Sequence, residues 1–352
     1  MSAQMRIAFR TLRLQKEFPL TISRGTSAGS ENLFVSATRG GVTGWGEAAP
    51  GVREGAKRAA DMQTALAGFC ESIDGDDDWA VMQIHDRARE RGLPACAIAA
   101  LDIALWDRLA RAANLPLHTL LGFGKPRAPT SMTIGINPPE VVRERAELLL
   151  ARGARALKIK LGSPDGTEAD REMFAQAAES ARGRAVSLRV DANGGWDVAD
   201  ARAMMKWLAE RGAEYVEQPL AEGREEELPA LYKNRPLPLF VDESCRFAED
   251  LPKWAHAVDG VNIKLMKCGG VSGALRILAA ARAFGLKTMI GCMSESSMSI
   301  SAAAALGGAL DHIDLDSQLN LAPDPCRGAE FVDGVVMPNG RPGHGAEIVH
   351  AE

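Results

Sequence analysis

Residues 156–162 read ALKIKLG, a short apolar run that carries two lysines one residue apart. Side chains alternate along a β-strand, so Lys158 and Lys160 share one face while Ile159 and Leu161 share the other. An ammonium group that is buried without a partner is strongly unfavourable. We therefore expect a buried strand whose two lysines face acidic groups from other parts of the chain.

This strand belongs to a repeat that begins near residue 128. From there, short apolar runs alternate with amphipathic stretches of helical periodicity, and the last of eight such runs is HIDLDS at residues 312–317. Alternating strands and helices predict parallel pairing, and eight strands in this order predict a closed barrel. Barrels of this kind carry their active sites at the carboxyl ends of the strands.

The first third of the chain has a different pattern. The runs RIAFRTLRL, NLFVSATRG and VTGWGEAAP, all within residues 4–50, alternate in polarity and predict an antiparallel meander. Residues 54–114 have apolar positions spaced three and four apart, as in amphipathic helices. Strands followed by helices predict an α+β domain. The segments 20–30 and 48–56 are expected to form lid loops over the active site.

The composition excludes several classes of protein. The 352 residues are 46% hydrophobic, which is ample for a packed core, and the net charge of −5 argues against a nucleic-acid partner. There is no run of 18 apolar residues and no signal-peptide core at the N-terminus, so we expect a cytoplasmic protein without a membrane partner. The six cysteines include no CxxC pair, which indicates reduced thiols.

Charged residues stand at the predicted carboxyl ends of successive barrel strands. Because each strand delivers its end to the same mouth of the barrel, these side chains are expected to converge. Successive positions are separated by about one strand and helix unit. The residues, in chain order, are Lys158 and Lys160, Asp191, Glu217, Asp242, Lys264, and the pair Asp314 and Asp316.

Three of these residues predict a metal site. Asp191, Glu217 and Asp242 fall on adjacent strands, where their carboxylates would repel one another without a cation. Hard oxygen ligands suit a divalent ion such as Mg²⁺, one per active site, and Mn²⁺ can replace it. Lys160 and Lys264 are four strands apart in a ring of eight, so a substrate on the metal would meet one amine on each face.

That arrangement predicts a proton-transfer mechanism. A substrate carboxylate on Mg²⁺ can accept charge when its α-proton leaves, because the ion stabilises the enediolate. One of the two lysines, Lys160 or Lys264, acts as general base and the other as general acid on the opposite face. Lys158 is expected to polarise the enolate oxygen. Burial and neighbouring cations should lower the pKa of the basic lysine.

The strand-end motifs together resemble those of one family. KIKLG, VDANGGW, VEQPL, VDES and VNIKLMKCGGVSGA are similar, in order and spacing, to the motifs of the enolase superfamily in its muconate lactonizing subgroup. The resemblance implies two lysines flanking a Mg²⁺ ion. It also implies a modified (β/α)7β barrel at residues 126–320, an α+β capping domain at 1–125, and a C-terminal segment at 321–352 that returns to the cap.

Two features narrow the substrate within that subgroup. Asp314 and Asp316 share one face of the last strand and resemble the paired aspartates with which dipeptide epimerases hold the substrate α-ammonium group. The segment ISRGTSAGSEN resembles the mobile loop of L-Ala-D/L-Glu epimerases, and its Arg24 matches the arginine that pairs with the glutamate side chain. Thr133 and Asn193 are also assigned to substrate binding.

The sequence therefore favours a Mg²⁺-dependent epimerase of L-Ala-D/L-Glu or a related dipeptide, active in recycling of cell-wall peptides and built as a homo-oligomer. N-acyl amino acid racemases, o-succinylbenzoate synthases and cycloisomerases are the alternatives with the same chemistry. A metal-dependent hydrolase or a binding protein without turnover is the alternative of another class. In that interpretation the acids are solvated strand ends or helix caps, the lysines are their salt-bridge partners, and Arg24 is a solvated loop residue.

Overall fold

The computed structural model describes residues 5–73 and 79–350. Its centre is one eight-stranded sheet in which every neighbouring pair is parallel and the strand order is β11-β10-β9-β8-β7-β6-β5-β4. A parallel bridge between Thr130 and Ile313 joins the first strand region to the last. The strands are β4 (Met132–Ile134), β5 (Ala156–Lys160), β6 (Ser187–Asp191), β7 (Ala213–Glu217), β8 (Leu239–Val241), β9 (Gly260–Lys264), β10 (Lys287–Gly291) and β11 (His312–Asp314).

Each of the seven connections between barrel strands contains a helix, so the barrel is of the (β/α)7β type that the sequence predicts. Strand β5 is buried along its whole length because helices cover the outside of the barrel and side chains fill the inside. The helices are α5 (Pro139–Ala151), α6 (Thr167–Ala181), α7 (Val198–Ala209), α8 (Leu228–Tyr232), α9 (Leu251–Trp254), α10 (Leu265–Cys268), α11 (Val271–Ala283) and α12 (Ser297–Ala304). Short 3₁₀ helices lie at Glu225–Glu227, Ala248–Asp250, Ala255–Ala257, Gly307–Ala309 and Ser317–Asn320.

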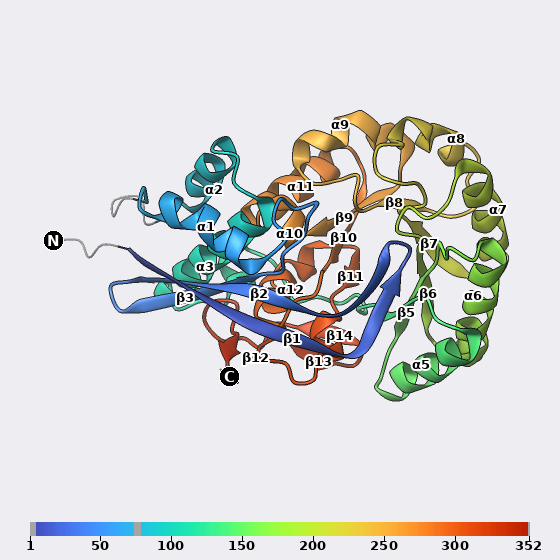
Figure 1. Cartoon of the computed structure of the whole chain (residues 1–352), viewed down its shortest axis with the longest axis horizontal. Helices are drawn as coiled ribbons and strands as arrows, with labels where there is room; N and C mark the ends of the chain where they lie inside the picture. The colour runs from blue at the N-terminus through green and yellow to red at the C-terminus, as the bar shows by residue number, and fades with distance from the viewer. Residues whose placement is uncertain (1–4, 74–78, 351–352) are drawn as a thin grey trace.

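The N-terminal region is the predicted α+β layer. Three antiparallel strands, β1 (Arg6–Ile22), β2 (Gly25–Arg39) and β3 (Val42–Ala48), are followed by α1 (Ala59–Cys70), α2 (Val81–Glu90), α3 (Ala95–Ala112) and α4 (Leu117–Leu120). Gly44 and Gly46 allow α3 to lie directly on β3, because a Cβ at either position would fall within 2.2 Å of a carbonyl oxygen of α3. Figure 1 shows the β1–β2 hairpin, in blue, extending from these helices to the barrel.

The capping layer and the barrel share one continuous core of buried apolar residues, which includes Leu33 of β2, Ile103 of α3 and Ile159 of β5. A polar contact fixes their relative position. The buried carboxylate of Glu47, in β3, accepts hydrogen bonds from the backbone and hydroxyl of Ser296 at the N-terminus of α12, the shortest at 2.6 Å. An acidic group at a helix N-terminus is favourable because it faces unpaired N–H groups and the positive end of the helix dipole.

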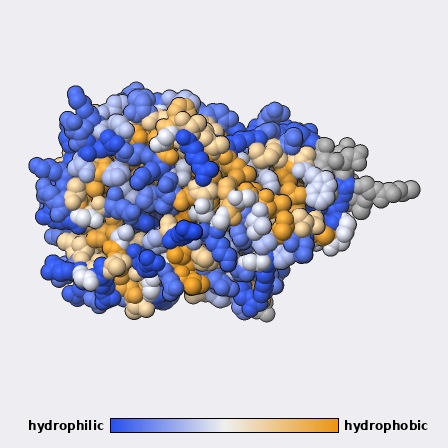
Figure 2. All heavy atoms as spheres, turned by 180° about the vertical axis from the view of Figure 1, so that it is seen from behind, coloured by the Kyte–Doolittle hydropathy of each residue, from blue (hydrophilic) through white to orange (hydrophobic). Residues whose placement is uncertain are grey.

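The C-terminal segment lies against the capping helices. Its strands are β12 (Cys326–Arg327), β13 (Glu330–Val332), β14 (Val335–Met337) and β15 (Glu347–Ile348). The His344 N–H donates to Asp107 Oδ1 of α3 at 2.8 Å, and the Leu117 N–H of α4 donates to Gly343 O at 2.7 Å. Figure 2 shows the face opposite to that of Figure 1, where hydrophobic residues form bands between larger hydrophilic areas. No helix within the described ranges is long and apolar enough to cross a membrane.

Candidate active site

Strand register places the predicted site residues side by side. Lys160 pairs with Asp191 across β5 and β6, and Asp191 pairs with Glu217 across β6 and β7. Asp242 directly follows β8, and Lys264 is the last residue of β9. Because parallel strands in register end at the same level, the local order of the sequence becomes a ring of side chains at the barrel mouth.

The three carboxylates form a cluster that can hold a metal ion. One oxygen each from Asp191, Glu217 and Asp242 lies within 4.8 Å of the other two, and all three residues are buried. Burial and the neighbouring Asp191 carboxylate raise the pKa of Glu217 to about 7, which is the electrostatic cost of placing like charges together. A buried set of hard oxygen ligands at this spacing fits Mg²⁺.

Two lysines contact this cluster from opposite sides of the mouth. Lys160 Nζ lies 2.6 Å from Asp191 Oδ2, and Lys264 Nζ lies 2.7 Å from Asp242 Oδ2. Strands β6, β7 and β8 separate their strands in the sheet. Burial lowers the pKa of Lys264, but the carboxylates of Asp242 and Glu243 outweigh burial and raise it above its usual value.

Lys158 lies beneath the cluster and is fully buried. Its Nζ is 2.7 Å from Glu217 Oε2, 3.3 Å from Asp191 Oδ2 and 2.6 Å from Asp314 Oδ2. Burial lowers the pKa of Lys158, yet these three carboxylates raise it well above its usual value. The Lys158 ammonium group therefore connects the carboxylate cluster on β6 and β7 with the acid on β11.

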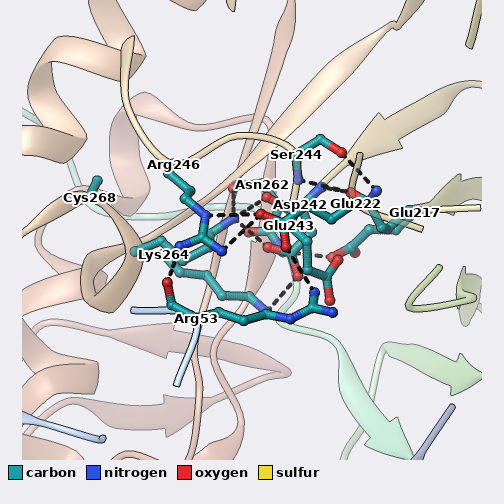
Figure 3. Close-up of polar contacts among 12 residues, drawn as sticks. Arg53, Glu217, Glu222, Asp242, Glu243, Ser244, Arg246, Asn262, Lys264 and Cys268 are labelled. Atoms are coloured by element: carbon teal, nitrogen blue, oxygen red, sulfur yellow. Dashed lines mark hydrogen bonds and ion pairs between the residues drawn. The ribbon is translucent and has the colours of Figure 1, made fainter. Parts of the chain in front are cut away.

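Three residues that contact the site were not predicted from the strand ends. Lys267 is buried one helical turn after Lys264, and its Nζ donates to Asp242 Oδ1 at 2.5 Å. Asn262 Nδ2 donates to Glu217 Oε1 at 2.8 Å, which orients that carboxylate (Figure 3). Gly291 leaves space for both neighbours, because a Cβ there would lie 2.8 Å from the Asn262 amide and 3.1 Å from Lys264 Cε. The second lysine of KLMKCGG was the available signal for Lys267, whereas nothing local marks Asn262 or Gly291.

The last barrel strand brings two aspartates and Thr133 together. The backbone N–H of Thr133, in β4, donates to Asp316 Oδ2 at 2.6 Å. Asp314 uses Oδ2 for Lys158, while its Oδ1 is buried and has no hydrogen-bond partner within the described residues. Burial and the Asp314 carboxylate raise the pKa of Asp316 to about 6. The pair thus offers carboxylate oxygens that a cationic ligand group would satisfy.

The tip of the β1–β2 hairpin closes one side of the mouth. Arg24 lies in the turn, where its guanidinium donates to Asn193 O at 2.7 Å and pairs with Glu243 at 2.6 Å. The Asn193 amide in turn donates to Asp191 Oδ2 at 3.2 Å. The segment 20–30, expected as a loop, is instead mostly paired strand, since Leu20 pairs with Ser27 and Ile22 with Gly25. Strand pairing gives this part of the lid a defined shape.

The second lid segment is held by another ion pair. Arg53 Nη1 lies 3.2 Å from Glu222 Oε2, in the loop after β7. Arg246 also pairs with Glu222, at 2.8 Å, and donates to the carbonyl oxygen of Arg53 (Figure 3). The segment 48–56 is therefore attached to barrel loops through charged side chains.

A cavity of about 430 Å³ lies between the lid and the barrel mouth. Lys160, Asp242, Lys264, Asp314 and Asp316 line it on the barrel side. Much of the remaining wall is apolar and comes from the hairpin, β4, α5 and the segments after β10 and β11. These apolar residues include Phe18, Leu20, Ile22, Met132, Ile134, Leu149, Met293 and Leu319. A mostly apolar pocket with a few convergent polar groups is typical of a small-molecule site.

The fold and this arrangement agree with two family models. Residues 5–122 match the mandelate racemase / muconate lactonizing enzyme N-terminal domain, and residues 140–352 match the enolase C-terminal domain-like family. The chain belongs to the mandelate racemase and muconate lactonizing enzyme family of the enolase superfamily, as its strand-end motifs predicted.

Named relatives cover almost the whole chain. The hydrophobic dipeptide epimerase of Flavobacteria bacterium strain MS024-2A is 57% identical over 98% of both chains. The hydrophobic dipeptide epimerase of Roseobacter litoralis is 56% identical over 99% of this chain and 100% of its own. Among solved structures, the dipeptide epimerase from Enterococcus faecalis V583 complexed with Mg and the dipeptide L-Leu-L-Tyr is 31% identical. It covers 98% of this chain and 99% of its own, with a TM-score of 0.91.

Proposed function

We propose that this protein is a Mg²⁺-dependent epimerase of dipeptides with apolar side chains, which inverts the α-carbon of the second residue. One observation carries the proposal. Lys160 and Lys264 reach a cluster of three buried carboxylates from opposite sides of the same cavity. Inversion needs proton removal on one face of a carbon and proton return on the other, and this pair of amines supplies both.

The chain's own residues define the steps. Asp191, Glu217 and Asp242 would hold Mg²⁺, which supplies positive charge to the substrate carboxylate and so makes its α-proton more acidic. One lysine accepts the α-proton as general base. The electron pair of the broken Cα–H bond stays on the substrate, which becomes an enediolate. The lysine on the other face then donates a proton to the same carbon. Lys158, buried beneath the cluster with its Nζ on Asp191, Glu217 and Asp314, adds positive charge below the carboxylates and would polarise the enediolate from there.

Asp314 and Asp316 fit the α-ammonium group of a dipeptide. Asp314 Oδ1 is a buried acceptor that no described residue satisfies, and both residues line the cavity. A free ammonium group would complete its hydrogen bonding, whereas an N-acyl group would leave it unpaired. Thr133 and Asn193 support the site through their contacts with Asp316 and Asp191.

The cavity favours apolar substrate side chains over an acidic one. Its wall includes Phe18, Leu20 and Ile134, and the relatives from Flavobacteria bacterium and Roseobacter litoralis, at 57% and 56% identity, are named for hydrophobic dipeptides. Arg24, which would bind the side chain of a glutamate substrate, already pairs with Glu243. L-Ala-D/L-Glu, and with it a cytoplasmic role in recycling of cell-wall peptides, is the alternative that the same assay separates.

The test is incubation of the purified protein with Mg²⁺ and single dipeptides in D₂O, followed by NMR of the α-proton of the second residue. L-Leu-L-Tyr should lose that proton signal and yield L-Leu-D-Tyr, and L-Ala-L-Glu should react more slowly. Lys206→Met, a change on the exposed face of α7, serves as the unaffected control. Exchange with N-succinyl amino acids alone would replace the proposal with an N-acyl amino acid racemase, and no exchange with any of these compounds would refute it.

A further inference from the structure

One cationic side chain in the cavity has no role in the steps above. Lys16 lies in β1 where the pairing with β2 shifts register between Gln15 and Leu20. There its backbone pairs instead with Leu321, and the Ala322 N–H donates to Gln15 O at 2.9 Å. This part of the hairpin is therefore fixed against the segment that directly follows Asp316.

The side chain of Lys16 is buried without a carboxylate partner. It is 7% exposed, and its Nζ donates to the hydroxyls of Ser27 at 3.0 Å and Ser294 at 2.6 Å. No carboxylate of residues 5–73 or 79–350 lies within ion-pair distance of this group. A lysine ammonium carries three N–H donors, so one remains after both serines are satisfied. Lys16 lines the cavity, where that donor is available to a ligand.

The neighbourhood of Lys16 suggests which ligand atom it meets. Burial lowers the pKa of Lys16, and the nearby Asp316 carboxylate acts against that shift and favours the charged ammonium form. Asp314 Oδ1, which is buried and has no hydrogen-bond partner within the described residues, belongs to a residue that lines the same cavity as Lys16. In a dipeptide, the α-ammonium nitrogen and the peptide carbonyl oxygen are joined through two carbons and lie roughly 3 Å apart. The carboxylates of Asp314 and Asp316 can accept hydrogen bonds from the ammonium group, and the remaining N–H of Lys16 can donate to the carbonyl oxygen.

We propose that Lys16 is a substrate-binding residue that donates a hydrogen bond to the peptide carbonyl oxygen of a dipeptide whose ammonium group lies at Asp314 and Asp316. The inference rests on the proposed function, because it assumes a dipeptide in this orientation. The competing ligand group is an acidic side chain on the first residue. That group would have to lie beside the Asp316 carboxylate, where like charges repel.

The test compares L-leucylglycine with its thioamide analogue, in which sulfur, a weaker acceptor, replaces the peptide oxygen. Glycine has no stereocentre, so the ligand is not epimerised during titration calorimetry with Mg²⁺. The unmodified protein should bind the oxygen compound about tenfold more tightly than the thioamide, as expected for a hydrogen bond to a charged donor. Lys16→Met should bind the oxygen compound about tenfold more weakly and show no preference between the two.

Thermal unfolding separates this role from a structural one. Lys16→Met removes a buried ammonium group that has two serine hydroxyls but no carboxylate as partners, and should leave the melting temperature unchanged or raised. Lys16→Arg should keep part of the preference for oxygen, and Lys206→Met should keep all of it. The proposal would be overturned if Lys16→Met still preferred the oxygen compound as strongly as the unmodified protein does. It would also be overturned if Lys16→Met had a lower melting temperature and lost affinity equally for both ligands. A loss of affinity in Lys16→Met for L-aspartylglycine but not for L-leucylglycine would also overturn the proposal, because Lys16 would then bind an acidic side chain.

Binding and turnover keep the two proposals apart. If L-leucylglycine binds with the oxygen preference but neither L-Leu-L-Tyr nor L-Ala-L-Glu exchanges its α-proton in D₂O, the epimerase function fails while the Lys16 contact stands. If exchange occurs and the preference survives in Lys16→Met, the function stands and the Lys16 contact fails. Absence of binding to any dipeptide would overturn both.

Discussion

Arg24, in the turn of the β1–β2 hairpin, forms a 2.6 Å ion pair with Glu243, the residue next to the candidate metal ligand Asp242. This charged pair therefore joins the capping layer to the rim of the barrel directly beside the candidate metal site. The Arg24 side chain is 36% exposed and that of Glu243 is 9% exposed, so the pair is only partly screened by solvent. Arg24 therefore anchors the turn of the β1–β2 hairpin to the loop that follows β8.

This relationship predicts that loss of Arg24 affects all substrates alike. Arg24→Met should lower kcat/KM about tenfold for L-Leu-L-Tyr and for L-Ala-L-Glu, because Glu243 loses its partner and the hairpin its anchor. Glu243→Gln should give a similar loss, and the double variant should lose little more than either single one. A loss restricted to L-Ala-L-Glu would show that Arg24 binds the substrate side chain instead.

The opposed lysines predict separable half-reactions. Lys160→Ala and Lys264→Ala should each abolish epimerisation, because inversion needs both faces of the α-carbon. Each variant should still exchange the α-proton of one epimer with solvent deuterium, and the two variants should differ in which epimer they exchange. NMR of L,L and L,D dipeptides in D₂O measures this directly. Exchange of both epimers by both variants would contradict the assignment.

The carboxylate cluster predicts the metal dependence. Glu217→Gln and Asp242→Asn should weaken Mg²⁺ binding at least about tenfold and abolish turnover, because each removes a charged ligand. Asp314→Asn changes a buried acid of the same cavity outside the cluster, so it should keep Mg²⁺ affinity while weakening dipeptide binding. Calorimetric titration with Mg²⁺ alone measures the affinity. Turnover that survives EDTA in either ligand variant would exclude this ligand set.

Gly291 predicts a steric defect in the site. Gly291→Ala places a methyl group 2.8 Å from the Asn262 amide and 3.1 Å from Lys264 Cε, so one of them must move. Overpacking of this kind costs about 1–3 kcal/mol, and displacement of Lys264 should lower kcat more than it raises KM. Gly68→Ala is the matched control. Gly68 lies in α1 with nothing near its Cβ position, so that change should stabilise the protein by about 0.5–1 kcal/mol.

Asp102 predicts a pH dependence of stability that is independent of the active site. Burial raises the pKa of Asp102 to about 7, although Ser272 donates to it. The folded protein therefore binds this proton more tightly than the unfolded chain does. Stability from this group is fully present below about pH 4 and is lost as pH rises through about 7. Over that pH range, the ionisation of Asp102 should lower the free energy of unfolding by about 4 kcal/mol in total.

Denaturant unfolding across pH 4–8 checks this prediction. Asp102→Asn cannot ionise, so its free energy of unfolding should fall less over that range than that of the unmodified protein. Equal slopes for the two proteins would mean that Asp102 does not titrate between the folded and unfolded states as described.

Local patterns determined the barrel and most of its chemistry. Lys160, Asp191, Glu217 and Lys264 each end an apolar strand, and parallel register alone is enough to bring such ends together. Alternation of strands and helices is a short-range property, which is why an eight-stranded parallel barrel and an α+β domain could be predicted from the pattern. The (β/α)7β form and the capping role followed from the resemblance to the family.

Tertiary structure decided which groups meet across the chain. Lys158 reaches Asp314 from a strand 156 residues earlier, Glu47 of the cap binds the N-terminus of α12, and Lys16 is buried beside Ser294. No short sequence window specifies such contacts, because they depend on where the hairpin and the last strands fall after the barrel closes. The sequence therefore determined the candidate reacting groups, whereas packing of the cap on the barrel decided their partners, the shape of the cavity and the charges left for a ligand.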